Sequence, residues 1–516
     1  MAEQERFSDV RDWIARFERR SFLQGVAKVG EEIVGSYAQL TLSDGRTLTI
    51  AHHFLARVAL ISSVYGRNHG QTPSRDDILL ACAHWNQLED PFAEIADGAA
   101  GVDDLHAVLI RTSWDQFPVQ ERPQDNIRIW YGIYLRALAE GILGPEFDEL
   151  WSKTFGLPLD EWYRAALIYW LLVIAPSLPP EAMGLPPGTH GVGIASYFAV
   201  GELRARLDRF GVSGTNVEAA VRDLSQDYAE LKARYERTKP ADEMFERYAV
   251  NPLTSFPILR PDATHFVLPV ARLFGNALGL ATLYRLMAND GNFPSQFGKA
   301  FEHYVGETLR ASFKTVLPEE TYRDGKQEWS GFDWTVVEQE FALVIEVRSS
   351  RIPVDAKTSG DVEATIDGLK RAVSEPASKM PTKIEHIRKG LTKTPADILD
   401  RPVHRLIVTV ENMHLESLYT ELAGYDPKDP DAPIVVSIAD LQNLLSVDGK
   451  TIHELVEEYQ NQYVRMQTGS IGQWLRSHTV YDPLIGQHPV TQEDRVLPMP
   501  PKPPGIAADS ERSKDE

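Results

Sequence analysis

Two neighbouring stretches, residues 331–337 and 341–348, carry the side chains best suited to chemistry in this chain of 516 residues. If they pair as antiparallel strands about the turn between them, Asp333 lies directly opposite Glu346. Arg348 follows on the same face. The opposite face is apolar and carries Trp334, Val336, Phe341, Leu343, Ile345 and Val347.

Carboxylates placed directly opposite each other on paired strands lie about 5 Å apart and repel. Burying a carboxylate costs several kcal/mol unless it is paired or binds a metal. A divalent cation between Asp333 and Glu346 satisfies both conditions, and Mg²⁺ prefers oxygen ligands. Alternatively, Arg348 or Arg351 neutralises Glu346 at the end of the sheet. Gly331, opposite Arg348, leaves space beside that side chain.

The helix expected at residues 296–313 must position a third carboxylate. Its apolar stripe predicts packing on the sheet, and Glu302 lies at the edge of this stripe. Gly298 and Gly306 lie one turn on either side of Glu302 and allow the helix to approach the sheet closely. Glu302 can then reach the site, or it is a solvated residue on the flank of the helix.

The types and spacing of these residues resemble those of a known family. Asp333, twelve intervening residues and then Glu346-Val347-Arg348 at the end of an apolar strand resemble the PD-(D/E)XK, or restriction-endonuclease-like, superfamily. The order of helices and strands over residues 293–450 is similar to that fold, and residues 297–305 resemble a helix of defence-associated members.

The resemblance implies a metal-dependent nuclease that cleaves phosphodiester bonds, with DNA favoured over RNA, in defence against phage or foreign DNA. It implies that Asp333, Glu346 and the Val347 carbonyl hold Mg²⁺ or Mn²⁺, and that Glu302 supports this metal site. Asp333, Glu346, Arg348 and Glu302 are accordingly the expected catalytic residues.

Position 348 departs from the family pattern, which has a lysine there. Arginine has a pKa above 12 and cannot act as a base, but it can orient a water molecule or hold a phosphate oxygen. The site is then active with an altered residue, or it borrows Lys299 or Lys370. The alternative is a catalytically degenerate fold that binds nucleic acid or serves as an assembly scaffold in a defence complex.

The chain has a formal net charge of −21, so binding of nucleic acid requires a local basic patch. Residues 368–393 contain seven Lys or Arg and two Glu. Lys and Arg directed at phosphates position a strand without reading its sequence. The alternative is a solvated helix face. The expected nucleic-acid-binding residues are Lys370, Arg371, Lys379, Lys383, Arg388 and Lys389.

The pattern predicts a multidomain protein: a mostly α-helical N-terminal domain and an α/β sandwich of PD-(D/E)XK type with a central mixed sheet. The helical domain would sense a trigger, bind a protein partner or form a homo-oligomer. The expected segments are a sensing or regulatory domain with a small hairpin (1–240), a bridging segment (241–292), the nuclease domain (293–465) and an extension with a disordered Pro-rich tail (466–516).

Within these segments, amphipathic spacing and alternation predict individual elements. Expected helices include 54–64, 127–138, 217–231, 273–287, 296–313, 361–391, 414–423 and 439–445. Expected strands are 38–42 and 47–50 in the hairpin, 265–269, 315–322, 331–337, 341–348, 404–411 and 433–437.

Several classes of protein are disfavoured. Cys82 is the only cysteine, which excludes an intramolecular disulfide and fits a reducing compartment. The apolar run 165–175 is too short to span a bilayer, and the charged N-terminus lacks a signal-peptide pattern. We therefore expect a cytoplasmic protein without a membrane partner. No Walker, dinucleotide-binding or Gly-x-Ser-x-Gly motif occurs, and His52-His53 are expected to be structural.

Overall fold

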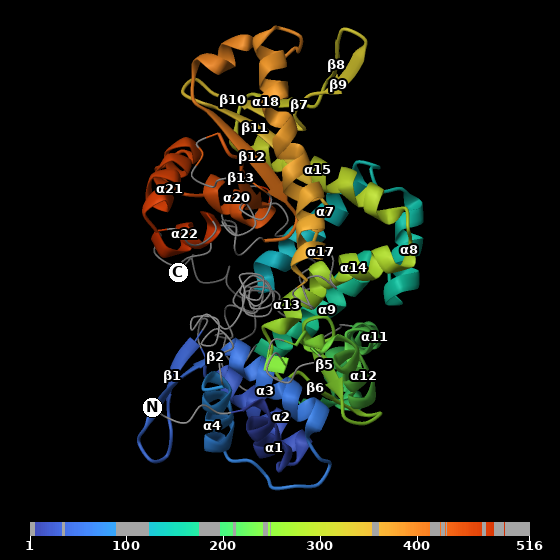
Figure 1. Ribbon diagram of the computed structural model, residues 1–516. Helices are drawn as coiled ribbons and strands as arrows, with labels where there is room; N and C mark the ends of the chain where they lie inside the picture. The colour runs from blue at the N-terminus through green and yellow to red at the C-terminus, as the bar shows by residue number, and fades with distance from the viewer. Residues whose placement is uncertain are drawn as a thin grey trace, which may run out of the picture.

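The protein mixes helices with sheets that combine parallel and antiparallel strands (Figure 1). The computed structural model describes residues 6–33, 37–88, 123–174, 197–209, 213–240, 246–247, 249–352, 361–412, 424, 429, 431–466, 471–478 and 490. The expected helix at 414–423 and the Pro-rich tail beyond residue 490 lie outside these residues.

The described residues 6–88 are helical with one hairpin, whereas the expected helical segment 1–240 also contains two short strands, Tyr197–Ala199 and Ser225–Asp227, that the sequence did not predict. The elements of residues 6–88 are α1 (Phe7–Ala15), α2 (Arg19–Glu31), β1 (Tyr37–Thr41), β2 (Thr47–Ala51), α3 (His52–Tyr65) and α4 (Arg75–Asn86). Strands β1 and β2 pair from Tyr37 with Ala51 to Thr41 with Thr47. Cys82 is buried in α4. The predicted hairpin is confirmed.

The middle of the chain adds helices and a small four-stranded sheet in the order β3-β6-β5-β4. The helices are α7 (Pro123–Ala139), α8 (Pro145–Phe155), α9 (Leu159–Ile174), α10 (Val200–Arg209), α11 (Gly214–Asp223), α12 (Tyr228–Thr238), η4 (Pro252–Thr254), α13 (Leu273–Leu278) and α14 (Leu280–Asn289). The strands are β3 (Tyr197–Ala199), β4 (Ser225–Asp227), β5 (Ile258–Arg260) and β6 (His265–Val267).

Two helices expected in this part are interrupted. The expected helix 217–231 divides at β4, where Asp227 caps the next helix by accepting a hydrogen bond from Glu230 N. The expected helix 273–287 breaks at Gly279, whose φ of −102° and ψ of −107° are not helical. A Cβ atom there would lie 2.8 Å from the Trp130 ring, so the glycine permits close packing.

A five-stranded mixed sheet lies in the half of the picture away from the N-terminal helices in Figure 1. Its order is β13-β12-β11-β10-β7, with β13, β12 and β11 parallel and β10 antiparallel to both of its neighbours. The strands are β7 (Val316–Pro318), β10 (Trp334–Val337), β11 (Ala342–Arg348), β12 (Val403–Thr409) and β13 (Ile434–Ser437).

Helices cover both faces of this sheet. One face packs on α15 (Phe293–Ser312) and α20 (Ile438–Leu445), and the other on the helical segment α17 (Val362–Leu369), η5 (Lys370–Ser374) and α18 (Glu375–Arg388). The segment η5 is a wide π-helical turn just before Pro376, a residue that cannot donate a helical hydrogen bond. Helices α21 (Ile452–Met466) and α22 (Ile471–His478) follow α20.

A second hairpin leaves the sheet just before β10. Strands β8 (Thr321–Asp324) and β9 (Gln327–Ser330) form this projecting arm (Figure 1), whereas the sequence predicted one strand at 315–322. His386 of α18 fastens it, because His386 Nδ1 lies 2.9 Å from the Tyr322 hydroxyl and Trp329 packs edge-on against the imidazole.

Buried side chains on both sides of residue 240 share their cores. Tyr235 of α12 and Val267 of β6 belong to the core of α1–α4. Trp130 of α7 stacks on Phe297 of α15 with ring centroids 5.8 Å apart, within the core that includes the sheet. The segment boundaries given above therefore stay predictions. No helix within the described ranges is both long and apolar enough to cross a membrane.

Candidate active site

The pairing of β10 with β11 is the one predicted from the sequence. Trp334 pairs with Ile345 and Val337 with Ala342. The same register, continued by one residue beyond β10, places Asp333 opposite Glu346. Asp333 itself precedes the strand, which begins at Trp334 rather than at the expected residue 331. The Asp333 side chain takes the place of a backbone hydrogen-bond acceptor, because its Oδ2 accepts a hydrogen bond of 2.6 Å from Val347 N.

The apolar face of this hairpin packs on α15, and this packing brings Glu302 to the site. Gly306 of α15 lies against the Trp334 indole so closely that a Cβ atom would overlap the ring. Trp334 Nε1 donates to the Glu302 carbonyl at 3.1 Å. Gly298 approaches the sheet as well, with Ser349 Oγ 3.2 Å from where its Cβ would lie. The predicted close approach of this helix is confirmed.

Arg348 joins the two carboxylates. Its Nη1 donates to Asp333 Oδ2 at 3.1 Å and to the Val347 carbonyl at 2.8 Å, and its Nη2 donates to Glu346 Oε2 at 2.5 Å. Of the two arginines proposed to neutralise Glu346, Arg348 does so. Arg351 instead lies over the Tyr284 ring, 4.7 Å from its centroid.

Lys383 of α18 is the second cation of the site. The sequence assigned it to an exposed basic face, and this assignment is wrong: Lys383 is 7% exposed. Its Nζ donates to Glu346 Oε1 at 2.5 Å and to the Gly331 carbonyl at 2.6 Å. A buried ammonium requires such partners. Lys383 therefore belongs to the acidic pair rather than to the surface.

The region beside Gly331 is also more crowded than the sequence suggested. Gly331 N donates to the Glu320 carbonyl at 2.7 Å, and a Cβ atom on Gly331 would lie 3.3 Å from that oxygen. The glycine thus allows two backbone segments to approach closely. The free space expected there for the Arg348 side chain is occupied by Glu320.

Burial and like charge raise the pKa values of two carboxyl groups of the site, Glu346 and Glu302. Burial raises the pKa of Glu346, and the charge of Asp333 adds to this, whereas Lys383 and Arg348 oppose it. Burial, followed by the charges of Asp333 and Glu319, raises the pKa of Glu302 to about 7. The three carboxyl groups Glu302, Asp333 and Glu346 therefore share one electrostatic environment.

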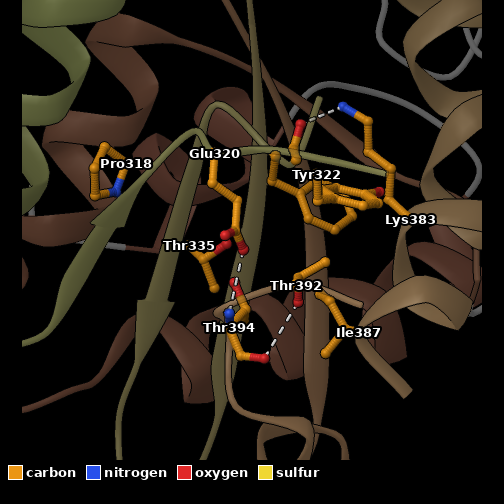
Figure 2. Close-up of a pocket in the computed structure, with 10 residues that line it drawn as sticks. Pro318, Glu320, Tyr322, Thr335, Lys383, Ile387, Thr392 and Thr394 are labelled. Atoms are coloured by element: carbon orange, nitrogen blue, oxygen red, sulfur yellow. Dashed lines mark hydrogen bonds between the residues drawn. The ribbon is translucent and has the colours of Figure 1, made fainter. Parts of the chain in front are cut away.

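A pocket opens beside Lys383 (Figure 2). It is small, with about 10 Å³ of free space, enough for roughly one water molecule. Hydroxyl groups of Tyr322, Thr335, Thr392 and Thr394 belong to its lining residues, together with Phe332, whose ring centroid lies 5.3 Å from Lys383 Nζ. Figure 2 shows the lysine side chain at the edge of this pocket, with its ammonium group hydrogen-bonded to the Gly331 carbonyl.

The other predicted basic residues of this segment remain on the surface. Lys370, Arg371, Lys379, Arg388 and Lys389 are exposed. Three of them have acidic neighbours: Lys370 pairs with Asp367 at 2.6 Å, and Arg388 and Lys389 both pair with Glu385. Lys299, considered above as a lysine that the site could borrow, is also exposed.

The oxygen atoms of the site fit a hard divalent cation. Asp333, Glu346 and the Val347 carbonyl converge, because all three bind the same guanidinium group, and Mg²⁺ and Mn²⁺ favour such oxygen ligands. Among the residues that the structure describes, no three His, Cys, Asp or Glu side chains form a metal-binding group. A cation here would therefore need the carbonyl and water as further ligands.

Two residues near the site were missed by sequence reasoning. Lys383 lies 37 residues after Glu346, but a signal existed: it falls within the buried stripe of Met380, Ile384 and Ile387 on α18. A lysine inside an apolar stripe predicts a buried partner. Glu319 follows Pro318, which pairs with Trp334, so the same register places Glu319 beside Asp333.

Comparisons of the chain with known protein families, curated proteins and solved structures found no match. The resemblance to the PD-(D/E)XK superfamily therefore rests on the residues and the order of elements given above.

Proposed function

We propose that this chain is a metal-dependent nuclease that cleaves phosphodiester bonds, with its active site at the carboxyl end of β11. The observation that carries the proposal is the placement of Asp333 and Glu346 on one face of paired strands, with the Val347 carbonyl beside them. These are the ligand positions of the PD-(D/E)XK pattern. That resemblance also favours DNA as the substrate and a role in defence against foreign DNA.

Asp333, Glu346 and the Val347 carbonyl would hold Mg²⁺ or Mn²⁺. Such a cation supplies Lewis acidity at a phosphate oxygen and lowers the pKa of bound water. Glu302 lies close enough for its pKa to respond to the charge of Asp333, so a cation in the site would favour the charged form of Glu302.

In this proposal, Lys383 has the role of the lysine that lies two residues after the glutamate in the PD-(D/E)XK pattern. Its Nζ lies 2.5 Å from Glu346 Oε1 although it comes from α18 rather than from β11. An ammonium group at this point can orient a water molecule and stabilise negative charge that develops on the phosphate. Arg348 can bind a phosphate oxygen but cannot accept a proton.

The nucleic acid would approach along the exposed basic face of the helical segment α17–η5–α18. This segment has five exposed basic residues, and its helix α18 also carries the buried Lys383; the five are Lys370, Arg371, Lys379, Arg388 and Lys389. In a chain of net charge −21, this local cluster supplies the positive potential that a phosphate backbone requires.

A second candidate function is supported by the ion pairs themselves. Arg348 and Lys383 occupy both oxygens of Glu346, so the cluster is neutralised by protein groups alone. A site of this kind can bind nucleic acid or stabilise an assembly without catalysis.

A cleavage assay tests the proposal. The full chain is incubated with Mg²⁺ or Mn²⁺ and with a panel of DNA and RNA substrates, next to the variants Glu346→Gln and Glu340→Gln. Glu340 is exposed on the turn of the same hairpin, so it is the matched control. We expect the wild type and Glu340→Gln to cleave, and Glu346→Gln to lose about 10²-fold or more.

If Glu346→Gln cleaves as fast as the wild type, the residues around Glu346 are not the active site. Binding of nucleic acid without any cleavage by the wild type would favour the second candidate function. Circular dichroism of each variant verifies that the fold is retained.

A further inference from the structure

The guanidinium of Arg348 occupies the point on which the oxygen ligands converge. It contacts Asp333 Oδ2 at 3.1 Å, Glu346 Oε2 at 2.5 Å and the Val347 carbonyl at 2.8 Å. These are the three groups that the proposed function assigns to a divalent cation. A cation with oxygen ligands at about 2.1 Å and this guanidinium cannot occupy the same place.

Arg348 and Lys383 differ in how they are held. The Lys383 side chain is 8% exposed and keeps two hydrogen-bonded partners on the α18 side of the site. The Arg348 side chain is 26% exposed and comes from the last residue of β11. Arg348 therefore has a path to solvent that leaves the backbone and Lys383 in place.

The charges of the site favour a bound cation only after the Arg348 side chain has left. With Arg348 in place, Asp333 and Glu346 face two cations, so these two carboxylates attract a divalent ion only weakly. When Arg348 leaves, Asp333 and Glu346 face only Lys383, and the negative potential attracts a cation. A phosphate group is a suitable alternative partner for Arg348, because guanidinium binds phosphate through paired hydrogen bonds.

We propose, on the basis of the proposed function, that Arg348 holds the cation position in the free protein and leaves it when a nucleic-acid phosphate binds the guanidinium. Metal and nucleic acid then bind cooperatively, since each favours the conformation in which Arg348 has turned outward. Reciprocity of linked binding requires that nucleic acid tightens metal binding by the same factor as metal tightens nucleic-acid binding.

The proposal is tested by direct measurement of Mn²⁺ binding, using titration calorimetry on the full chain. If the outward conformation makes up about a tenth of the free protein, Mn²⁺ binds about tenfold more weakly than to an open site. Arg348→Gln should therefore bind Mn²⁺ about tenfold or more tightly than the wild type. Arg351→Gln is the matched control, since Arg351 contacts Met287 and Tyr284 instead, and it should bind like the wild type.

Two further measurements locate and explain the effect. Adding Glu346→Gln to Arg348→Gln should abolish the tighter binding. A short DNA duplex with cleavage-resistant phosphorothioate linkages should tighten Mn²⁺ binding to the wild type but not to Arg348→Gln.

Equal Mn²⁺ affinity of the wild type and Arg348→Gln would overturn the proposal, as would weaker binding by the variant. A duplex that leaves wild-type Mn²⁺ affinity unchanged would overturn the coupling to nucleic acid. These outcomes are separate from failure of the proposed function, which would appear as absence of cleavage by the wild type on every substrate.

Discussion

Two clusters of buried ionic groups in this protein can be compared directly. Between the helices α11 and α14, Asp223 pairs with Arg285, whose Nη1 donates to Asp223 Oδ2 at 2.9 Å, and Trp162 Nε1 donates to the same oxygen at 3.1 Å. At the end of β11, two carboxylates share Arg348 and Lys383. The first cluster has one anion and one cation; the second has two of each, with Glu302 nearby.

The difference lies in what holds the acidic groups. Asp223 and Arg285 come from separate helices, so their pairing itself helps to hold these helices together. Asp333 and Glu346 lie on adjacent paired segments of one sheet, where backbone register keeps them together despite their repulsion. A cluster held independently of its cations can exchange one of them, and this is a property that a binding site needs.

The largest effect on stability is expected at the ion pair between Asp223 of α11 and Arg285 of α14. Arg285→Met leaves the 14% exposed Asp223 side chain without its cation, which costs about 3–5 kcal/mol in the free energy of unfolding. Urea unfolding followed by tryptophan fluorescence measures this loss. Arg323→Met is the control, because the Arg323 side chain is 77% exposed and its loss should cost less than about 0.5 kcal/mol. A similar small loss for Arg285→Met would contradict the structural role.

At the site, the main effect should be on catalysis. Lys383→Met leaves Glu346 paired with Arg348, so we expect a smaller loss of stability, about 1–2 kcal/mol. Cleavage should fall about 10²-fold, because a donor that stabilises developing charge is removed. Lys314→Met, at an exposed position after α15, should retain full activity. If Lys383→Met cleaves like Lys314→Met, Lys383 is only a structural counter-ion.

The exposed basic residues near the site should bind nucleic-acid phosphates, whereas the surroundings of the Asp223–Arg285 ion pair should not. Reversing the charges of Lys379, Arg388 and Lys389 to Glu should reduce nucleic-acid affinity. The log–log salt slope should fall by about one for each lost phosphate contact. Affinity is measured by fluorescence anisotropy over a salt series.

A control variant distinguishes the loss of local phosphate contacts from the effect of a more negative net charge. It carries Lys153→Glu, Lys232→Glu and Lys314→Glu, which are exposed lysines on other elements. It changes the net charge equally and should keep the wild-type slope. If both triple variants lose affinity alike, the net charge of the chain is responsible rather than the α18 surface.

The smallest effect concerns Glu302. Its pKa of about 7 in the folded protein is above the ordinary 4.5, so the folded protein retains this proton to higher pH than the unfolded chain. Stability therefore falls as pH rises from about 4.5 through 7. Glu302→Gln should raise the free energy of unfolding by about 1 kcal/mol at pH 8 after solvent screening. At pH 4 it should change little.

The groups that act on Glu302 are Asp333, Glu319 and Glu346, which raise its pKa, and Arg348, which lowers it. Urea unfolding at pH 4 and pH 8 measures the difference, with Glu340→Gln as the control. A stabilisation by Glu302→Gln that is the same at both pH values would show that the carboxyl charge is not its cause.

The sequence predicted the part of the site that depends on local alternation. Apolar residues such as Trp334 and Ile345 must share a face, and this fixed the β10–β11 register that places Asp333 opposite Glu346. Glu302 could be predicted from the small residues around it, since Gly306 lets α15 approach Trp334. Both predictions require only the periods of strands and helices.

The remaining features depend on contacts between distant segments. The charged neighbours of Lys383 favour a surface position, whereas its place between Met380 and Ile384 in the buried stripe of α18 favours the core. The break at Gly279 follows from packing against Trp130, which is distant in sequence. The β8–β9 hairpin was missed because its two strands are short and mostly exposed. Tertiary packing decides each of these cases, and one sequence alone carries little information about it.

The hairpin arm has a mechanical consequence for the site. His386, which fastens β8–β9 to α18, lies three residues from Lys383, and both side chains are buried. One rigid turn of helix thus connects a projecting arm to the ammonium beside Glu346. A ligand that binds the arm therefore contacts a segment that is attached to α18 within one helical turn of Lys383.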